Sequence, residues 1–203
     1  MCNLKNGLLF VVSGPSGTGK GTVCAELLKN SDDLFLSVSA TTRDIRPGEV
    51  DGVNYIYLSK EQFGAMIDSG DMLEYAQFDG NFYGTPRKSV EKSISEGKNV
   101  LLEIEIQGAL KVKEIFPEAI LIYLIPPSMH ELYDRLKNRG RETKEQIKNR
   151  MDITLSELPH AMKYDHIIVN ADLDDCVREV RELIDKKINE KTKIENLLNE
   201  ILI

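Results

Sequence analysis

The sequence is short of cysteine, has no excess of basic residues and contains no long apolar run. Its 203 residues include 26 lysines and arginines against 33 aspartates and glutamates, so the formal net charge is -7. Nucleic-acid backbones need a basic protein face, and this charge therefore argues against a large nucleic-acid interface. The length is sufficient for one domain with a sizeable core.

The cysteine and apolar patterns together favour a cytoplasmic protein. Cys2, Cys24 and Cys176 are scattered and odd in number, which indicates neither a metal site nor a disulfide framework. The apolar run at residues 8–12 is too short to span a bilayer, and the N-terminus lacks the features of a secretory signal. We therefore expect a reducing compartment and no membrane partner.

A glycine-rich stretch, SGPSGTGKGT, follows this apolar run directly. Gly14, Gly17 and Gly19 let the backbone turn sharply and point several N–H groups inward, and such a concave row of donors binds phosphate. The run before it predicts a buried parallel strand, and the residues after it predict a helix whose N-terminal end adds to the anion site. Strand, glycine loop and helix in this order are the context that the phosphate-loop motif requires.

The end of this loop departs from the usual pattern by one residue. Gly21 follows Lys20, and the hydroxyl that normally comes next stands at Thr22. A glycine turn without a ligand is the alternative, and the lysine and flanking elements argue against it. The shift leaves open whether Thr22 contacts a metal ion or only the phosphate.

Apolar strand candidates recur along the chain with helical patterns between them. They lie at 8–13, 99–106, 119–125 and 165–169. This alternation predicts an α/β fold with a mostly parallel sheet.

Two segments break the alternation. Residues 35–96 contain strand-like pieces at 53–58 and 72–78 and a turn at DGN, which predicts a small inserted lobe. Residues 126–158 are helical and dense in arginine and lysine, and their composition predicts a mobile lid.

Three helix starts carry capping signals, a proline at the first helical position or a hydroxyl paired with a glutamate or glutamine. The pairs are Thr85 with Pro86, Ser128 with Glu131, and Thr143 with Gln146. Each predicts the N-terminus of a helix.

The tail KTKIENLLNEILI carries one helical stripe of apolar residues, at 194, 197, 198, 201 and 202. Such stripes usually mark core, so we expect the end of a helix packed on the domain. A contact with a second subunit, and hence a homodimer, is the alternative.

Arginines form two groups in this acidic chain. Arg43 and Arg46 stand three apart in a predicted loop, where binding residues concentrate. Arg135 and Arg139 stand four apart on one helix face, and Arg150 follows in the next helix. Arginine makes forked contacts to phosphate oxygens, so two groups would suit two nucleotides. A solvated charged face with intrahelical ion pairs is the alternative.

The predicted strand VLLEIEIQGA places Glu103 and Glu105 on one face, because side chains alternate along a strand. Carboxylates at the end of an apolar strand are costly unless a positive group meets them. Ligands of parallel sheets gather at this end, so hydrated magnesium, an arginine or a base N–H group would suit the pair. An edge strand with one wet face is the alternative.

Seven motifs follow one another along the chain. They are SGPSGTGKGT, SVSATTRDIRPGEVDGVNYIYLS, EYAQFDGNFYGTP, LLEIEIQGA, IPPSMHELYDRLKNRGRET, KNRM and YDHIIVNADL. In this order they make the chain resemble guanylate kinases from about Gly7 to about Lys186. The resemblance implies an α/β P-loop kinase with a parallel five-stranded core sheet flanked by helices, an inserted GMP-binding α+β lobe and a helical lid.

The resemblance also implies boundaries and a reaction. One domain would span 7–186, with the core at 7–34, 97–125 and 159–186, the lobe at about 35–96, the lid at about 126–158 and a C-terminal helical extension at 187–203. The reaction would transfer the γ-phosphoryl group of ATP to GMP, and to dGMP, giving ADP and GDP in purine nucleotide metabolism and GMP recycling.

Each matching position receives an implied role. The catalytic residues would be Lys20, Arg43, Arg135, Arg139 and Arg150. The ATP phosphates would be wrapped by Gly14, Pro15, Ser16, Gly17, Thr18, Gly19, Lys20, Gly21 and Thr22, with Asn170 near the adenine. The GMP site would comprise Ser39, Arg43, Arg46, Tyr55, Glu74, Tyr83, Thr85 and Glu105, the last standing where the family commonly has aspartate. Mg²⁺ would accompany ATP with no certain direct ligand, through Thr22, Glu103 and water.

Three other functions compete with this interpretation. Another small-molecule kinase of the same fold is disfavoured by Glu74, Thr85 and the paired tyrosines. A guanylate-kinase-like module that only binds proteins is disfavoured by the intact phosphate loop and the lid arginines. A domain that only hydrolyses nucleotide is disfavoured by the inserted acceptor lobe.

Overall fold

The computed structural model describes residues 6–29, 31–78, 80–138 and 143–201. Its central sheet has five strands in the order β2-β7-β1-β8-β9, and every neighbouring pair is parallel. The strands are β1 (Leu9–Ser13), β2 (Leu34–Leu36), β7 (Asn99–Glu103), β8 (Ile120–Ile125) and β9 (His166–Val169). The predicted parallel five-stranded sheet is confirmed.

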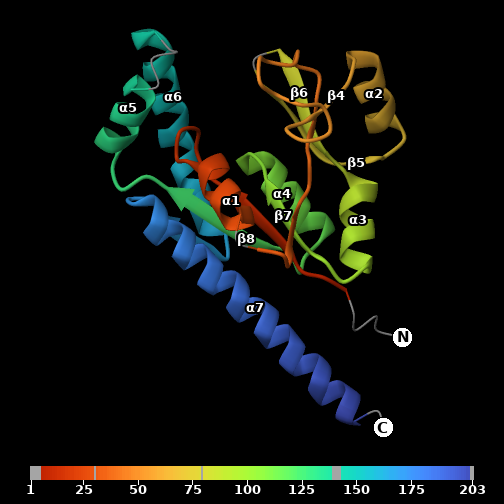
Figure 1. Cartoon of the computed structure of the whole chain (residues 1–203). Coiled ribbons are helices and arrows are strands. Elements are labelled where there is room, and N and C mark those ends of the chain that lie inside the picture. The colour runs from red at the N-terminus through yellow and green to blue at the C-terminus, as the bar shows by residue number, and fades with distance from the viewer. Residues whose placement is uncertain (1–5, 30, 79, 139–142, 202–203) are drawn as a thin grey trace.

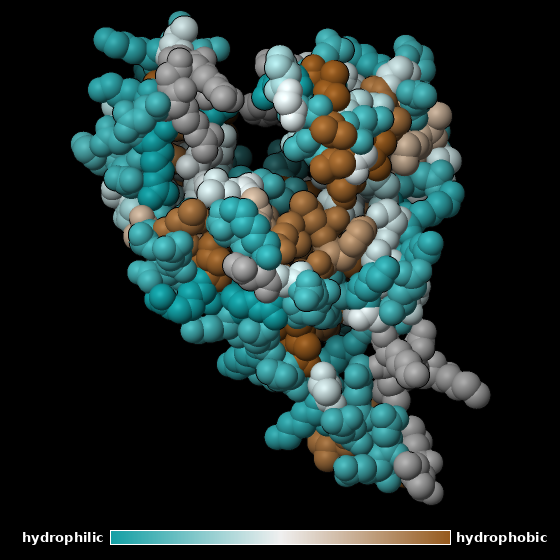
Figure 2. Space-filling model, in the orientation of Figure 1, coloured by the Kyte–Doolittle hydropathy of each residue, from teal (hydrophilic) through white to brown (hydrophobic). Residues whose placement is uncertain are grey.

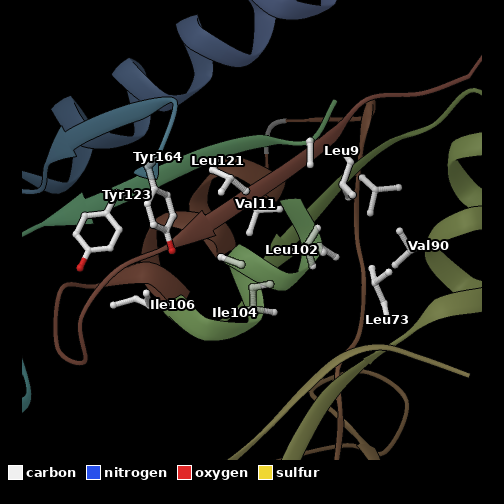
Figure 3. Close-up of a cluster of buried hydrophobic side chains, with 14 residues drawn as sticks. Leu9, Val11, Leu73, Val90, Leu102, Ile104, Ile106, Leu121, Tyr123 and Tyr164 are labelled. Atoms are coloured by element: carbon white, nitrogen blue, oxygen red, sulfur yellow. The ribbon is translucent and has the colours of Figure 1, made fainter. Parts of the chain in front are cut away.

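Helices cover both faces of this sheet (Figure 1). They are α1 (Lys20–Lys29) and α7 (Leu173–Ile201) on one face, and α3 (Arg87–Ser95) and α4 (Ile106–Ile115) on the other. Phe10 and Val12 of β1 pack toward the first pair, whereas Leu9 and Val11 pack toward the second. Because both faces are buried, the strand is apolar at every one of these positions. Figure 3 shows Leu9 and Val11 in one cluster with Ile106 of α4.

A second, smaller sheet forms the lobe inserted between β2 and α3. Its order is β4-β3-β6-β5, and the helix α2 packs against it through the buried Phe63. The elements are β3 (Ala40–Thr41), β4 (Ile56–Tyr57), α2 (Lys60–Asp68), β5 (Met72–Phe78) and β6 (Asn81–Pro86). Phe78 pairs with Asn81, which confirms a hairpin at the predicted turn, although Asp79 lies outside the described residues.

The lid segment lies between β8 and β9. It contains α5 (Met129–Asn138), α6 (Lys144–Glu157) and a 3₁₀ helix, η1 (Leu158–Lys163). The two α-helices share a small apolar cluster around Leu132, Leu136 and Ile147. The capping box of Thr143 with Gln146 is confirmed, and the Ser128 hydroxyl accepts from the Glu131 N–H at 3.1 Å.

The predicted helix start at Thr85 is wrong. Thr85 belongs to β6, Pro86 is the N-cap in an extended conformation, and α3 begins at Arg87. The Thr85 hydroxyl donates instead to the Glu74 carboxylate on the neighbouring strand at 2.6 Å. A charged acceptor directly across the hairpin is a stronger partner than a helical N–H group.

The prediction that the tail packs on the core is also wrong. Helix α7 has 29 residues, but its buried residues end at Ile184. At about 1.5 Å per residue such a helix outruns the sheet beneath it, and Figure 1 shows its end projecting away from the domain. Ile194, Leu197 and Ile201 are 58%, 50% and 78% exposed. Within the described part of the chain, no helix combines the length and apolar character needed to cross a membrane.

Candidate active site

The carboxyl ends of the central strands form the floor of the candidate site. β1 lies between β7 and β8, the point from which chain connections run in opposite directions, and ligands of open α/β sheets bind at such a point. The glycine loop follows β1, Glu103 ends β7 and Asn170 follows β9. Figure 2 shows the molecule hollowed above this floor, between the lid helices and the lobe.

The glycine loop is fixed by its own groups and by β9. The Thr18 hydroxyl is buried and donates to the Pro15 carbonyl at 2.8 Å. Asn170, predicted near the adenine, is also buried, and its side-chain amide donates to the Thr18 carbonyl at 2.7 Å. Gly19 has a φ of 91°, and a Cβ there would lie 2.6 Å from the Asn170 amide nitrogen. A side chain at residue 19 would therefore clash with Asn170 and strain the backbone of the loop.

The lid rests directly on this loop. Gly17 has a φ of 92°, and a Cβ there would lie 2.9 Å from methyl carbons of both Leu132 and Leu136 on α5. Both leucines are fully buried. The first lid helix therefore packs directly against the glycine loop at Gly17.

Lys20 is the first residue of α1, and its ammonium group lies against the loop that precedes it. Its Nζ donates to the carbonyl oxygens of Gly14 at 2.6 Å and Pro15 at 3.1 Å. Burial lowers the pKa of Lys20, and the negative charge of Glu103 opposes this effect. A positive group therefore lies against the backbone of the glycine loop.

The two carboxylates predicted on one strand face lie in different elements. Glu103 ends β7, whereas Glu105 is the N-cap of α4 and accepts from the N–H groups of Gln107 at 3.0 Å and Gly108 at 2.5 Å. The strand prediction to residue 106 is therefore wrong, because the first turn of a helix needs an acceptor for its free N–H groups. Loss of water around Glu103 raises its pKa, and the charge of Lys20 opposes this rise.

A third carboxylate, Glu157, escaped the sequence analysis. It ends α6, and burial raises its pKa, while the charge of Lys20 lowers it and that of Glu105 raises it. These effects place Glu157 within electrostatic reach of the floor of the site. Its position at the end of a lid helix carried no sequence signal for such a role.

The lobe contributes a buried carboxylate and hydroxyl. Glu74 on β5 is 4% exposed, Thr85 is fully buried, and their side chains lie 2.6 Å apart. Burial raises the pKa of Glu74 to about 7, although the Thr85 hydrogen bond opposes it, and the charge of Glu105 raises it further. A Cβ on Gly108 would lie 2.4 Å from Glu74 Oε2, so the start of α4 closely approaches this pair.

An arginine among tyrosines forms the second part of the lobe's site. The Arg43 guanidinium carbon lies 5.3 Å from the ring centre of Tyr55 and 5.7 Å from that of Tyr57. Tyr55 in turn meets Tyr83 edge to face at 6.0 Å. The structure thus brings together three of the predicted residues and adds Tyr57, which the sequence analysis did not select.

Two further predicted residues border this cluster, and Arg43 has an ion-pair partner that the sequence analysis did not select. Arg46 is exposed, and Ser39 is half-buried with its carbonyl accepting from the Ile56 N–H at 2.9 Å. Glu49 forms an ion pair with Arg43 at 2.8 Å, and its only sequence signal was proximity to the two arginines.

Two of the three predicted lid arginines lie among the described residues. Arg135 donates to Glu131 at 3.0 Å, the intrahelical pair that the sequence suggested, and to the Ala171 carbonyl at 3.2 Å. Ala171 follows Asn170, so Arg135 lies beside the end of β9. Arg150 is half-buried on α6, and Arg139 lies outside the described residues.

The donor groups fit a magnesium ion that is held mainly by nucleotide and water. In the described ranges, no three carboxylate, histidine or cysteine side chains converge to hold a metal ion. Thr22 is exposed in the first turn of α1, and the Glu103 carboxylate lies 3.4 Å from the place of a Cβ on Gly21. Magnesium keeps several waters and takes few protein ligands in sites of this kind.

Comparisons with known proteins agree with this geometry. The family model described as guanylate kinase matches residues 6–187. A guanylate kinase of Clostridioides difficile (strain 630) is 48% identical over 197 residues, which are 97% of this chain and 96% of the relative.

Two solved structures resemble the fold to different degrees. The crystal structure of guanylate kinase from Anaplasma phagocytophilum has a TM-score of 0.75 at 33% identity, covering 90% of this chain and 87% of that chain. A shikimate kinase from Bacteroides thetaiotaomicron has a TM-score of 0.50 at 12% identity, covering 88% and 98%, and it shares the fold alone. Sequence, fold and site agree over nearly the whole length, and the chain belongs to the guanylate kinase family.

Proposed function

We propose that the protein transfers the γ-phosphoryl group of ATP to GMP, and also to dGMP, yielding ADP and GDP for purine nucleotide metabolism and GMP recycling. The observation that carries this proposal is the buried Glu74–Thr85 pair, 2.6 Å apart, in a lobe that borders the hollow above the central sheet (Figure 2). The family relationship supports the same reaction.

Glu74 and Thr85 suit the edge of guanine. A carboxylate accepts hydrogen bonds from the ring N–H and the amino group of guanine, an arrangement that adenine lacks. The Thr85 hydroxyl proton faces Glu74 in the structure, and donation to the guanine carbonyl requires it to rotate. A buried polar site of this kind rejects the wrong base strongly, because its own groups would be left unpaired.

The phosphate of GMP suits the cluster of Arg43, Arg46, Tyr55 and Tyr83, with Ser39 at its border and Glu105 beside the base-reading pair. On the ATP side, the loop from Gly14 to Thr22 offers backbone N–H groups to the phosphates. These assignments rest on residue type, on the family pattern and on the proximity described above.

The chemical step needs charge stabilisation more than proton transfer. The attacking oxygen of GMP is already anionic, so we assign no general base. Lys20 and the lid arginines Arg135, Arg139 and Arg150 stabilise the negative charge that spreads over the transferred group. Asn170 keeps the loop in register by its hydrogen bond to Thr18.

Magnesium would be held by the nucleotide phosphates, with Thr22 and Glu103 contributing directly or through water. When bound, it neutralises charge on the phosphates of ATP. We further propose that the lobe at about 35–96 and the lid at about 126–158 close over the core, which excludes water and suppresses hydrolysis of ATP.

The proposed partners are ATP and GMP in the cytoplasm, with no nucleic acid or membrane. The exposed apolar stripe on α7 keeps a homodimer as the alternative to a monomer. Light scattering at several protein concentrations distinguishes the two states.

The test of the function is ADP formation from ATP and Mg²⁺ with GMP, dGMP, AMP, CMP or UMP offered separately, and with no acceptor. We expect ADP with GMP and dGMP only, matched by GDP or dGDP. Turnover with another base would refute the roles of Glu74 and Thr85. No turnover in folded protein would favour a module that only binds protein ligands.

A further inference from the structure

Glu49 lies in the loop between β3 and β4 and collects donors from several parts of the lobe. Its Oε1 accepts from Arg43 Nη2 at 2.8 Å. Its Oε2 accepts from Arg43 Nη1 at 2.9 Å, from the Tyr57 hydroxyl at 2.7 Å and from the Arg46 N–H at 2.8 Å. These bonds, Arg43 first and Tyr57 second, lower the pKa of Glu49 to about 2. The side chain is therefore an anion throughout the neutral range.

Glu49 binds one edge of the Arg43 guanidinium and leaves the hydrogen-bond donors of another edge free of contacts with Glu49. An arginine has five N–H donors in a fixed planar fork. Glu49 binds the end formed by Nη1 and Nη2, and the Asp44 carbonyl takes a further Nη1 hydrogen at 2.7 Å. Nε and the second Nη2 hydrogen remain, and no described residue is bonded to Nε. These two donors are parallel and match two oxygens of a phosphate.

The rings of Tyr55 and Tyr57 restrict the same guanidinium further. They lie 5.3 Å and 5.7 Å from its central carbon, within the range of a cation–π contact. Arg43 is thus held by two aromatic neighbours and by a bidentate carboxylate. Its side chain is only 11% exposed, unlike that of a mobile surface arginine.

We propose that Glu49 is a positioning residue for the acceptor, one that holds Arg43 so that its Nε and Nη2 donors face the phosphate of GMP. It acts through Arg43 and does not contact the substrate. A fixed arginine loses less conformational freedom on binding than a mobile one, so pre-organisation strengthens phosphate binding. This inference rests on the proposed function, since GMP supplies the phosphate.

Other roles for Glu49 predict different effects of its removal on ligand binding. If Glu49 were only a competing anion that the phosphate had to displace, its removal would strengthen GMP binding. If it served only to stabilise the loop, its removal would weaken binding of every ligand of the lobe, with or without a phosphate. Positioning predicts weaker binding of phosphate-bearing ligands alone.

The test compares Glu49→Gln with the unaltered protein in steady-state kinetics and in inhibition by guanosine. Glutamine keeps the size of the side chain but loses its charge, and its amide N–H₂ group opposes one Arg43 N–H. We expect KM for GMP to rise about tenfold or more, as for loss of one charged hydrogen bond. We expect the guanosine inhibition constant to change little, because guanosine has no phosphate. We expect KM for ATP to change little as well, because the proposed ATP site lies at the glycine loop and not at Arg43.

Asp44→Asn is the matched control, since it removes the same charge from the same loop. Asp44 is exposed and contacts Arg43 only through its backbone carbonyl, so KM for GMP should stay unchanged. Thermal unfolding of both variants shows whether the lobe is intact. If Glu49→Gln does not fold, Glu49→Asp tests the same point, because its shorter side chain keeps the charge and moves the guanidinium.

An unchanged or lower KM for GMP in the folded variant would overturn the proposal, and so would an equal loss of guanosine binding. Failure of the unaltered protein to phosphorylate GMP would instead refute the proposed function. The two failures are therefore distinguishable in one series of assays.

Discussion

The proposed donor site consists mainly of backbone groups, whereas the proposed acceptor site consists of side chains. On the donor side, a backbone loop is packed between β9 and the lid, with Thr18 and Asn170 buried and hydrogen-bonded inside it. On the acceptor side, the groups are side chains. Glu74 and Thr85 are buried on β5 and β6, whereas Arg43 lies on a partly exposed loop, in which Gly48 and Gly52 have no atom within 4 Å of an added Cβ.

This difference teaches where each site can change. Backbone N–H groups bind any phosphate. The donor site is therefore altered mainly by substitution of a glycine, which changes the backbone, or by loss of the Lys20 side chain. Side chains such as Glu74 and Arg43 can be exchanged one at a time, and each exchange affects one part of the acceptor. We therefore expect the donor side to determine whether transfer occurs and the acceptor side to determine what receives the phosphoryl group.

The largest effect should come from Lys20→Ala. We expect kcat to fall by about 10³-fold or more with every acceptor, since a charge-stabilising donor is lost from the transition state. Steady-state kinetics measure the loss, and circular dichroism verifies the fold. Lys29→Ala, on the same helix but paired with Glu26 at the surface, should retain activity. Near-normal turnover of the Lys20 variant would remove this residue from the mechanism.

Glu74→Ala should weaken discrimination between guanine and other bases without affecting the binding of ATP. We expect KM for GMP to rise about 100-fold and the preference for GMP over AMP to shrink, with KM for ATP little changed. Competition assays with both acceptors measure this preference. Glu61→Ala on the exposed face of α2 serves as the control in the same lobe. If the preference survives in the Glu74 variant, the base is recognised elsewhere.

The raised pKa of Glu74 predicts a pH effect confined to the acceptor side. Its carboxyl has a pKa of about 7, so it takes up a proton as the pH falls through neutrality and loses the ability to accept from guanine. Guanosine has no titrating phosphate, and we expect its inhibition constant to rise about tenfold from pH 8 to pH 6. Glu74→Gln should abolish this dependence. If the guanosine inhibition constant of the unaltered protein did not change with pH, this would contradict the role of an ionised Glu74 in binding guanine.

The smallest effect should come from the exposed end of α7, which belongs to neither site. Ending the chain at Glu190 removes Ile194, Leu197 and Ile201, all at least half exposed. We expect kcat to be unchanged and the free energy of unfolding to change by less than about 0.5 kcal/mol. Chemical denaturation and light scattering measure stability and mass. A large loss of activity, or a fall in the particle mass from that of a dimer to that of a monomer, would show that the tail has a partner. Either result would favour the homodimer.

Most of the central fold could be predicted because its signals are local and strong. The apolar strands and the glycine loop show their period and turn chemistry within a few residues, and the structure confirms β1, β7, β8 and β9. The range 99–106 was predicted too long because alternation continues through Glu105, which tertiary packing uses as a helix cap. Thr85 was misread for a similar reason, since its partner Glu74 is eleven residues away.

The candidate site was predicted as a set of residues rather than as an arrangement. Arg43, Tyr55 and Tyr83 were chosen by type and family pattern, and the structure brings them into contact. Glu49, Tyr57 and Glu157 escaped selection, because a carboxylate or phenol in a loop or at a helix end has no distinctive pattern until its partners are known.

By itself, the sequence determined the alternation of strands and helices, the phosphate-binding loop and the kinase family. The strands, helices and loop depend on residues that are close together in the chain, and the family is indicated by a series of such short motifs. The tertiary structure alone decided that the Glu74 carboxyl is buried against α4, that Asn170 holds the loop and that Glu49 orients Arg43. It also decided that the end of α7 stays exposed. Burial and pairing depend on groups from distant segments, and these meet only when the chain has folded.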